Sequence, residues 1–233
     1  MTLLLFAVAP VMAIIVYIYF QDKYEKEPAG LLIASFLFGA IVSIIIVTIL
    51  YLFTGHFIPI TDEFSVWQQF IQAFVVVALS EEFSKYVIVK YFNQPKKAFN
   101  EPYDGIIYAV MVSMGFACTE NIMYVLEGGY QTAILRAFTA VPAHATFGIL
   151  MGYFMGKAKF SNNRFKLNMA GLFLAVLFHG AYDFFLFIGF IPGISIGAFI
   201  SLIIGIFLSR KAIKRHQENS HFKTPQKTIE EHD

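Results

Sequence analysis

The chain has 233 residues, of which 58% are hydrophobic and only 14% are charged, and its mean hydropathy is +0.65. Because soluble domains usually carry about 25% charged residues, this composition excludes a soluble globular protein and predicts one that crosses a membrane several times. The formal net charge of +1 gives no electrostatic reason to expect nucleic acid as a partner.

Apolar runs of about 17 to 25 residues are long enough to cross the hydrocarbon core of a bilayer as helices. Candidate runs lie near residues 2–20, 31–53, 70–92, 105–127, 133–156, 168–190 and 192–208. We therefore expect an all-α fold in which residues 1–208 form one bundle of about seven transmembrane helices within the lipid bilayer. Residues 209–233 are charged and are expected to form a disordered cytoplasmic tail.

Lysine and arginine are concentrated after every second apolar run. The residues that follow the first, third, fifth and seventh runs are Lys23, Lys26, Lys96, Lys97, Lys157, Lys159, Arg164, Lys166, Arg210, Lys211, Lys214 and Arg215. By the positive-inside rule, this alternation predicts a multi-pass protein of the cell membrane with its N-terminus outside and its C-terminus in the cytoplasm. Arg136, near the outer end of the fifth run, is the exception, and its side chain is expected to extend to the interface.

Two adjacent acids and a lysine interrupt the third run near its centre: Glu81, Glu82 and Lys85. An ionisable side chain at the bilayer centre costs roughly 2.5 to 3.5 kcal/mol even on the mildest scale, so this cluster indicates a reaction or a transport path. On a helix, spacings of three and four residues place the ammonium beside either carboxylate. The lysine is expected to pair with one glutamate and to leave the other for proton transfer.

Further ionisable residues lie at similar depths in later runs. With a rise of about 1.5 Å per residue, His144 and His179 fall at the centres of the fifth and sixth runs, level with Glu81. Glu120 and Asp183 fall roughly 6 Å to the external side of the centres of their runs. We therefore expect four helices to bring carboxylates and imidazoles together at one site.

Local spacing adds detail to this site. His179 and Asp183 are four residues apart, so the carboxylate can accept a hydrogen bond from one ring nitrogen and fix the tautomer. Asn121 adds an amide next to Glu120, and Pro142 is expected to kink the fifth helix toward a cavity. Close helix approach is expected at Gly39, Gly115, Gly148, Gly152 and Gly156.

Four sequence segments on successive helices carry a resemblance to a known family. They are Glu81-Glu82-Phe83-Ser84-Lys85, Phe116-Ala117-Cys118-Thr119-Glu120-Asn121, His144 and His179-Gly180-Ala181-Tyr182-Asp183. The combination resembles the PrsW family of intramembrane proteases. That resemblance implies site-1 cleavage of a single-pass membrane anti-sigma factor, which after further processing releases an extracytoplasmic-function sigma factor in a stress response.

The wider group to which this family is related includes the CAAX prenyl endopeptidases. In that group the second motif commonly carries histidine where this chain has Glu120, and the first carries arginine one residue after the position of Lys85. These departures match PrsW and argue against the processing of prenylated proteins.

We expect a glutamate-dependent hydrolysis in which Glu81 or Glu82 takes a proton from a water that attacks the scissile carbonyl. His144, His179 or both would stabilise the oxyanion or position the water, and Glu120 would share the proton. The residues expected to act in catalysis are Glu81, Glu82, Glu120, His144 and His179, and those expected to support them are Lys85, Asn121 and Asp183.

A second version of the site binds zinc through His144, His179 and a carboxylate such as Glu120, because two imidazoles and a carboxylate form a catalytic zinc set. The sequence contains no His-Glu-x-x-His helix, so the choice between no cofactor and zinc stays open. The alternative function is a proton- or ion-coupled transporter, since chains of intramembrane acids and histidines also relay protons.

Overall fold

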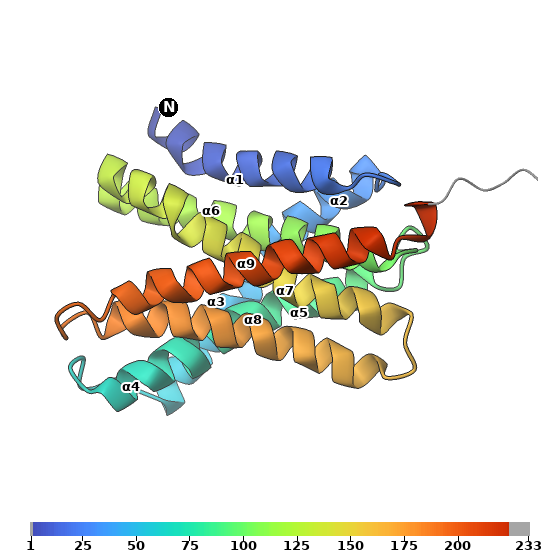
Figure 1. Ribbon diagram of the computed structural model, residues 1–233. Coiled ribbons are helices and arrows are strands. Elements are labelled where there is room, and N and C mark those ends of the chain that lie inside the picture. The colour runs from blue at the N-terminus through green and yellow to red at the C-terminus, as the bar shows by residue number, and fades with distance from the viewer. Residues whose placement is uncertain (1, 224–233) are drawn as a thin grey trace, which may run out of the picture.

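The computed structural model describes residues 2–223, and every regular element in that range is a helix (Figure 1). The helices are α1 (Thr2–Gln21), α2 (Ala29–Leu37), α3 (Ile44–Phe57), α4 (Val66–Ile71), α5 (Leu79–Ile88), α6 (Pro102–Phe138), α7 (Ala140–Lys159), α8 (Arg164–Phe187) and α9 (Ile196–Glu218). The π-helical segments η1 (Phe38–Ser43), η2 (Gln72–Ala78) and η3 (Val89–Asn93) continue some of them, and η4 (His221–Lys223) is a 3-10 turn. The predicted all-α fold is confirmed.

Five stretches among the described residues are long and apolar enough to cross a membrane: Thr2–Gln21, Ala29–Phe57, Pro102–Lys159, Arg164–Phe187 and Ile196–Glu218. One of them, Pro102–Lys159, contains two of the predicted runs. The helical stretch from α4 to η3 is not among the five, and it is the stretch that carries Glu81, Glu82 and Lys85. A multi-pass membrane protein is thus supported, while the count of seven helices stays a prediction.

The outer surface of the bundle is rich in large apolar side chains. Phe20, Leu52, Phe173 and Phe207 are each more than 60% exposed, at 71, 74, 64 and 68% respectively. Apolar surface on this scale is unusual for a soluble monomer. A bilayer around these helices would cover it with lipid.

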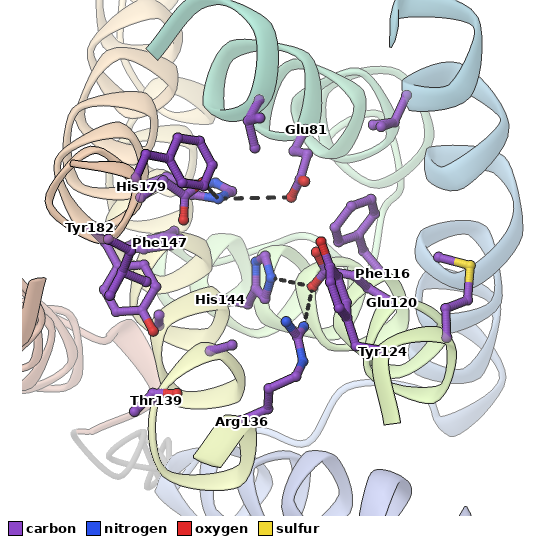
Figure 2. Close-up of a pocket in the computed structure, with 18 of the residues that line it drawn as sticks. Glu81, Phe116, Glu120, Tyr124, Arg136, Thr139, His144, Phe147, His179 and Tyr182 are labelled. Atoms are coloured by element: carbon purple, nitrogen blue, oxygen red, sulfur yellow. Dashed lines mark hydrogen bonds and ion pairs between the residues drawn. The ribbon is translucent and has the colours of Figure 1, made fainter. Parts of the chain in front are cut away.

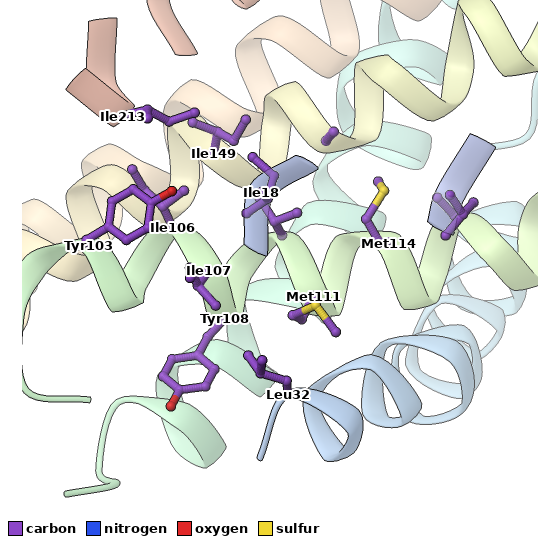
Figure 3. Close-up of a cluster of buried hydrophobic side chains, with 14 of the residues drawn as sticks. Ile18, Leu32, Tyr103, Ile106, Ile107, Tyr108, Met111, Met114, Ile149 and Ile213 are labelled. Atoms are coloured by element: carbon purple, nitrogen blue, oxygen red, sulfur yellow. The ribbon is translucent and has the colours of Figure 1, made fainter. Parts of the chain in front are cut away.

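Helix α6 lies at the centre of the bundle. Every residue from Tyr103 to Cys118 is buried, as expected for a helix surrounded by others. Figure 3 shows part of this core, in which α6 residues pack with Ile18 of α1, Ile149 of α7 and Ile213 of α9. Because its middle is packed on all sides, α6 holds the polar residues that follow in a defined position.

Glycines let α6 approach its neighbours closely. A side chain at Gly39 of η1 would clash with the backbone carbonyl of Val112, and one at Gly115 would clash with that of Phe36. On α7, side chains at Gly152 and Gly156 would likewise clash with the α6 backbone, and one at Gly148 would clash with the side chain of Ser113. The glycines that show this close approach include all five predicted ones: Gly39, Gly115, Gly148, Gly152 and Gly156.

The fourth run ends where the sequence predicts it, in the connection between residues 127 and 133. Gly129 adopts φ +70°, in the left-handed region that favours glycine, and breaks the helix. The residues after it, 130–138, fold back so that Ala133 packs against Val125. The fifth run, predicted as one helix over 133–156, is helical on both sides of an interruption at Thr139: residues 130–138 end α6, and α7 begins at Ala140. Pro142 lies in the first turn of α7, where proline is tolerated, so the run is interrupted three residues before the proline at which a kink is predicted.

The last helix also extends beyond its predicted end at residue 208. Helix α9 continues to Glu218, so the first ten residues assigned to the tail are helical. His216 near its end is buried and stacks on Tyr153 of α7, with 4.3 Å between the ring centroids, and this contact supports the extension. Residues 224–233 lie outside the described range, and their predicted disorder is not tested.

Candidate active site

A cavity of about 560 Å³ lies between α3, η2, α5, α6, α7 and α8 (Figure 2). Apolar side chains such as Phe116 and Phe147 form much of its wall. The polar residues that line it are Thr48, Tyr51, Gln72, Glu81, Glu120, Tyr124, Arg136, Thr139, His144, His179, Tyr182 and Asp183. An apolar membrane bundle thus encloses a polar chamber, which is the setting expected of a functional site.

Glu81 and Glu82 have different surroundings although they are adjacent. The ammonium of Lys85 lies 2.6 Å from Oε1 of Glu82 and 3.6 Å from Oε2 of Glu81. Glu82 is completely buried behind the cavity wall, whereas Glu81 faces the cavity. The π-helical segment η2 ends shortly before the pair, and such segments are frequent at functional sites. One glutamate is therefore held in an ion pair and the other is open to a substrate.

His144 lies between Lys85 and Glu120. Its Nδ1 is 3.3 Å from Nζ of Lys85 and its Nε2 is 2.9 Å from Oε2 of Glu120. Because an ammonium only donates hydrogen bonds, Nδ1 is assigned as the acceptor and Nε2 as the nitrogen that carries the hydrogen. His144 is thus a neutral imidazole with both ring nitrogens engaged.

His179 faces carboxylates on both sides. Its Nδ1 is 2.9 Å from Oε1 of Glu82, and its Nε2 is 3.2 Å from Oδ2 of Asp183 and 3.9 Å from Oε2 of Glu81. Carboxylates accept hydrogen bonds and do not donate them when ionised, so hydrogens on both ring nitrogens satisfy this arrangement. The ring stacks on Phe147 with 4.8 Å between the centroids, which fixes its plane.

Glu120 has a second partner in Arg136. The guanidinium Nη2 lies 2.6 Å from Oε2 of Glu120, and Nε donates to Oδ1 of Asn121 at 2.8 Å. Asn121 in turn donates to the backbone carbonyl of Ala7 on α1 at 2.7 Å. Figure 2 shows Arg136 and His144 converging on the same carboxylate of Glu120.

Sequence reasoning alone did not place Tyr51 and Arg136 at the site. The hydroxyl of Tyr51 donates to Oε1 of Glu81 at 2.9 Å, but a tyrosine near the end of an apolar run resembles an ordinary interfacial residue. For Arg136, the sequence does contain an indication, the Gly128-Gly129 pair. If this pair is interpreted as a sharp reversal of the chain, Arg136 is expected at the same depth as Glu120.

The structure brings the predicted residues together, but the group that could hold a metal ion differs from the predicted one. Glu81, Glu82, His144 and His179 each offer a ligand atom, and these atoms lie within 4.8 Å of one another. Glu120, predicted as a metal ligand, is outside this group because it is engaged by Arg136 and His144. Asn121 does not line the cavity, since its amide connects Arg136 to α1.

This group of four residues fits a metal ion by its chemistry. Two imidazoles with carboxylates are a donor set that zinc accepts. In addition, Oε2 of Glu81 and Oε2 of Glu82 are buried oxygens for which the described residues provide no hydrogen-bond partner. Buried polar atoms without a partner are rare and call for an explanation such as an ion or a water molecule.

The fold and the cavity define a multi-pass membrane protein with a carboxylate and imidazole site enclosed by its helices. The model of the PrsW family of intramembrane metalloproteases matches residues 27–210. The chain is 42% identical to Protease PrsW of Oceanobacillus iheyensis and 40% identical to that of Geobacillus kaustophilus, each over 180 residues that make up 77% of this chain and 80 or 77% of the relative. The corresponding protein of Bacillus subtilis is 35% identical over 181 residues, 77% of this chain and 80% of that protein. No solved structure matches the chain.

The family match covers more than half of the chain, and the curated relatives are aligned over more than three quarters of it. The chain therefore belongs to the PrsW family and is a membrane protease by that membership. The resemblance to this family inferred from the sequence is confirmed.

Proposed function

We propose that this protein hydrolyses a peptide bond of a single-pass membrane anti-sigma factor, as the site-1 cut that precedes release of an extracytoplasmic-function sigma factor in a stress response. The observation that carries the proposal is Glu81, a buried carboxylate that faces a chamber inside the bundle with His179 beside it. A peptide bond that is hydrolysed within a membrane needs such a chamber to admit water. Membership of a family of intramembrane proteases supports the same reaction class.

Glu81, rather than Glu82, is the general base in this proposal. Glu82 already binds Lys85 and His179 through Oε1 and has no surface in the cavity. Glu81 lines the cavity, and its Oε2 has no hydrogen-bond partner among the described residues. That oxygen is free to accept a proton from a water molecule that lies against the scissile carbonyl.

Glu81 accepts one proton early in the reaction and returns it later. The carboxylate takes one proton from water as the water oxygen bonds to the carbonyl carbon, and the carbonyl oxygen becomes an oxyanion. His179, with hydrogens on both nitrogens and Asp183 fixing its orientation, stabilises that charge. When the carbon–nitrogen bond breaks, Glu81 returns its proton to the amide nitrogen, and the products are a carboxylic acid and an amine, which become a carboxylate and an ammonium when the acid proton passes to the amine.

Lys85 supports this chemistry without contacting the substrate. Its ammonium binds Glu82, lies close to Nδ1 of His144 and sits 4.2 Å from the centre of the Phe116 ring. It thereby balances the negative charge of Glu82 and disfavours a positive charge on the imidazole of His144. Glu120 accepts the hydrogen of that imidazole and completes the arrangement.

The same residues are suited to zinc. In a zinc-bound form His179 would lose the hydrogen of one ring nitrogen. His144, His179 and Glu82 would then hold the ion and leave Glu81 as the base, and the ion would polarise the carbonyl and make a bound water more acidic. We expect the purified protein to retain about one zinc ion per chain. Metal analysis by mass spectrometry, with the His144→Ala variant as comparison, tests this. Equal metal content near zero in both proteins would contradict zinc binding.

A proton-coupled transporter would also place acids and histidines inside a membrane bundle. It predicts pH-driven flux in proteoliposomes without any change in a co-reconstituted membrane protein. The family match does not favour it, and the protease proposal is the better supported of the two.

Co-expression with a single-pass anti-sigma factor tagged at both ends tests the proposed function. We expect a new pair of fragments whose termini, mapped by mass spectrometry, lie in or next to the transmembrane segment. The fragments should be absent with the His179→Ala variant at equal expression. If no fragments appear with the intact protein, or if the variant produces the same fragments, the proposal is wrong.

A further inference from the structure

Arg136 has an unusual place in this fold. It lies near the end of the folded-back segment 130–138, yet its side chain is only 14% exposed and lines the cavity. The positive φ of Gly129 turns the chain back, and this reversal brings Arg136 opposite residues that precede it by 15 and 16 positions. A residue expected to extend to the interface is instead directed into the site.

The guanidinium of Arg136 is fixed in three ways. Nη2 contacts Glu120, Nε contacts Asn121, and the carbon of the guanidinium lies 4.2 Å from the centre of the Tyr124 ring. Asn121 is itself bound to the backbone of Ala7. A planar guanidinium suits such a set of directional contacts, which a lysine cannot reproduce in full.

The contact with Glu120 is transmitted to His144. Both Nη2 of Arg136 and Nε2 of His144 lie within 3 Å of the same oxygen, Oε2 of Glu120, at 2.6 and 2.9 Å. The position of that oxygen determines the direction in which the ring of His144 is held, and hence how Nδ1 faces Lys85. A change at Arg136 therefore alters the imidazole without touching it.

We propose that Arg136 is a positioning residue of the active site. It holds the folded-back segment 130–138 on α6 and fixes Glu120 as the acceptor that orients His144. This inference rests on the proposed proteolytic function for its kinetic consequences, whereas the structural contact it describes can be tested without activity.

The kinetic test uses purified protein in proteoliposomes with the tagged anti-sigma factor. Arg136→Gln should lower kcat by about 10- to 100-fold and leave KM nearly unchanged, because the change acts on the orientation of His144 in the reaction and not on the initial binding of the substrate. Arg136→Lys should recover part of the rate, since the charge opposite Glu120 is kept. Arg215→Gln, a change of the same kind at an exposed position, should behave like the unchanged protein.

A double variant separates positioning from a general effect on folding. In the Glu120→Gln background, adding Arg136→Gln should have little further effect on kcat, because residues that act as a unit are not additive. If the two effects multiply independently, or if Arg136→Gln cleaves at the unchanged rate, the proposal is overturned and the protease function stands.

The second test needs no substrate. In a Cys118→Ser background, a cysteine at Ala133, which is 1% exposed, should react slowly with N-ethylmaleimide and at least several-fold faster once Arg136→Gln releases the segment. A cysteine at Leu135, which is 61% exposed, should react quickly in both proteins and controls for reagent access. An unchanged rate at position 133 would overturn the proposal even if the protein is found to cleave nothing.

Discussion

Lys85 places one ammonium among two carboxylates and an imidazole, all deep within the bundle. It lies 2.6 Å from Glu82, 3.6 Å from Glu81 and 3.3 Å from His144. Removing one member of a buried ion pair leaves a charge without a partner, which costs much more than the pair itself contributes. The two glutamates should therefore respond differently to the loss of charge.

Glu82→Gln should destabilise the protein by about 3 to 5 kcal/mol, because Lys85 and His179 both lose their closest carboxylate. Glu81→Gln should have a much smaller effect, since Lys85 keeps Glu82 and the amide can still accept a hydrogen bond from Tyr51. Thermal unfolding in detergent micelles measures the difference. Similar unfolding temperatures for Glu82→Gln and the unchanged protein would contradict the division of roles.

At the scale of single residues, the cost of ionisable groups in an apolar run was enough to single out Glu81, Glu82, Glu120, His144 and His179. Depth within each run predicts that they meet, and in the structure all of them line one cavity except Glu82, which is buried behind its wall. Tyr51 and Arg136 could not be found in this way, because their participation depends on where neighbouring helices and a chain reversal place them.

Helix α6 shows what packing adds at the scale of an element. Its middle is fixed by close crossings at glycines, with Gly115 against the backbone of Phe36, while its end is reversed at Gly129. The sequence predicts the first feature through small residues in apolar runs. The second was predicted only as a short connection, because hydropathy does not distinguish a loop from a helix that folds back inside the bundle.

Gly115→Ala should destabilise the protein by about 1 to 3 kcal/mol, since the added methyl group has no space between α6 and α2. Gly55→Ala on α3 is the matched control: no atom lies within 4 Å of its added methyl group, so it should be neutral or slightly stabilising. Thermal unfolding of both variants under the same conditions tests this. Destabilisation by Gly55→Ala and not by Gly115→Ala would show that the crossing is wrong.

At the scale of the whole molecule, the predicted cytoplasmic end of the bundle gathers buried acids from separate elements. Asp22 and Glu27 follow α1, and Glu101 caps α6 and accepts a hydrogen bond from Ser220 after α9. The pKa of Asp22 is raised to about 7, chiefly by burial; Lys26 opposes this shift, and the nearby Glu101, Glu27 and Glu25 add to it. Burial also raises the pKa of Glu27 and of Glu101.

These raised pKa values make stability depend on pH in a defined direction. Below about pH 4 the carboxyl of Asp22 is protonated in both the folded and the unfolded protein. As the pH rises from about 4 to about 7, this carboxyl ionises in the unfolded chain but stays protonated in the folded protein, so the free energy of unfolding falls. Asp22→Asn should therefore raise the unfolding temperature relative to the unchanged protein, and by more at pH 7.5 than at pH 5. Glu63→Gln, at an exposed position, should show no such trend. A constant difference across this range would contradict the account.

The alternation of lysine and arginine between successive loops predicts the orientation of both termini and a site nearer the external face. That orientation remains a prediction. The bundle itself and the convergence of four helices on one site were accessible from length, hydropathy and depth. The start of α7 and the end of α9 were not, because they depend on the non-helical backbone of Thr139 and on the packing of His216.

The central claim is that Glu81 is the general base, and its most direct test is the cleavage rate of the tagged anti-sigma factor by the purified Glu81→Gln protein in proteoliposomes. We predict that this variant folds and binds the substrate like the unchanged protein but cleaves at least about 100-fold more slowly. Cleavage within about twofold of the unchanged rate by a folded Glu81→Gln protein would contradict the claim.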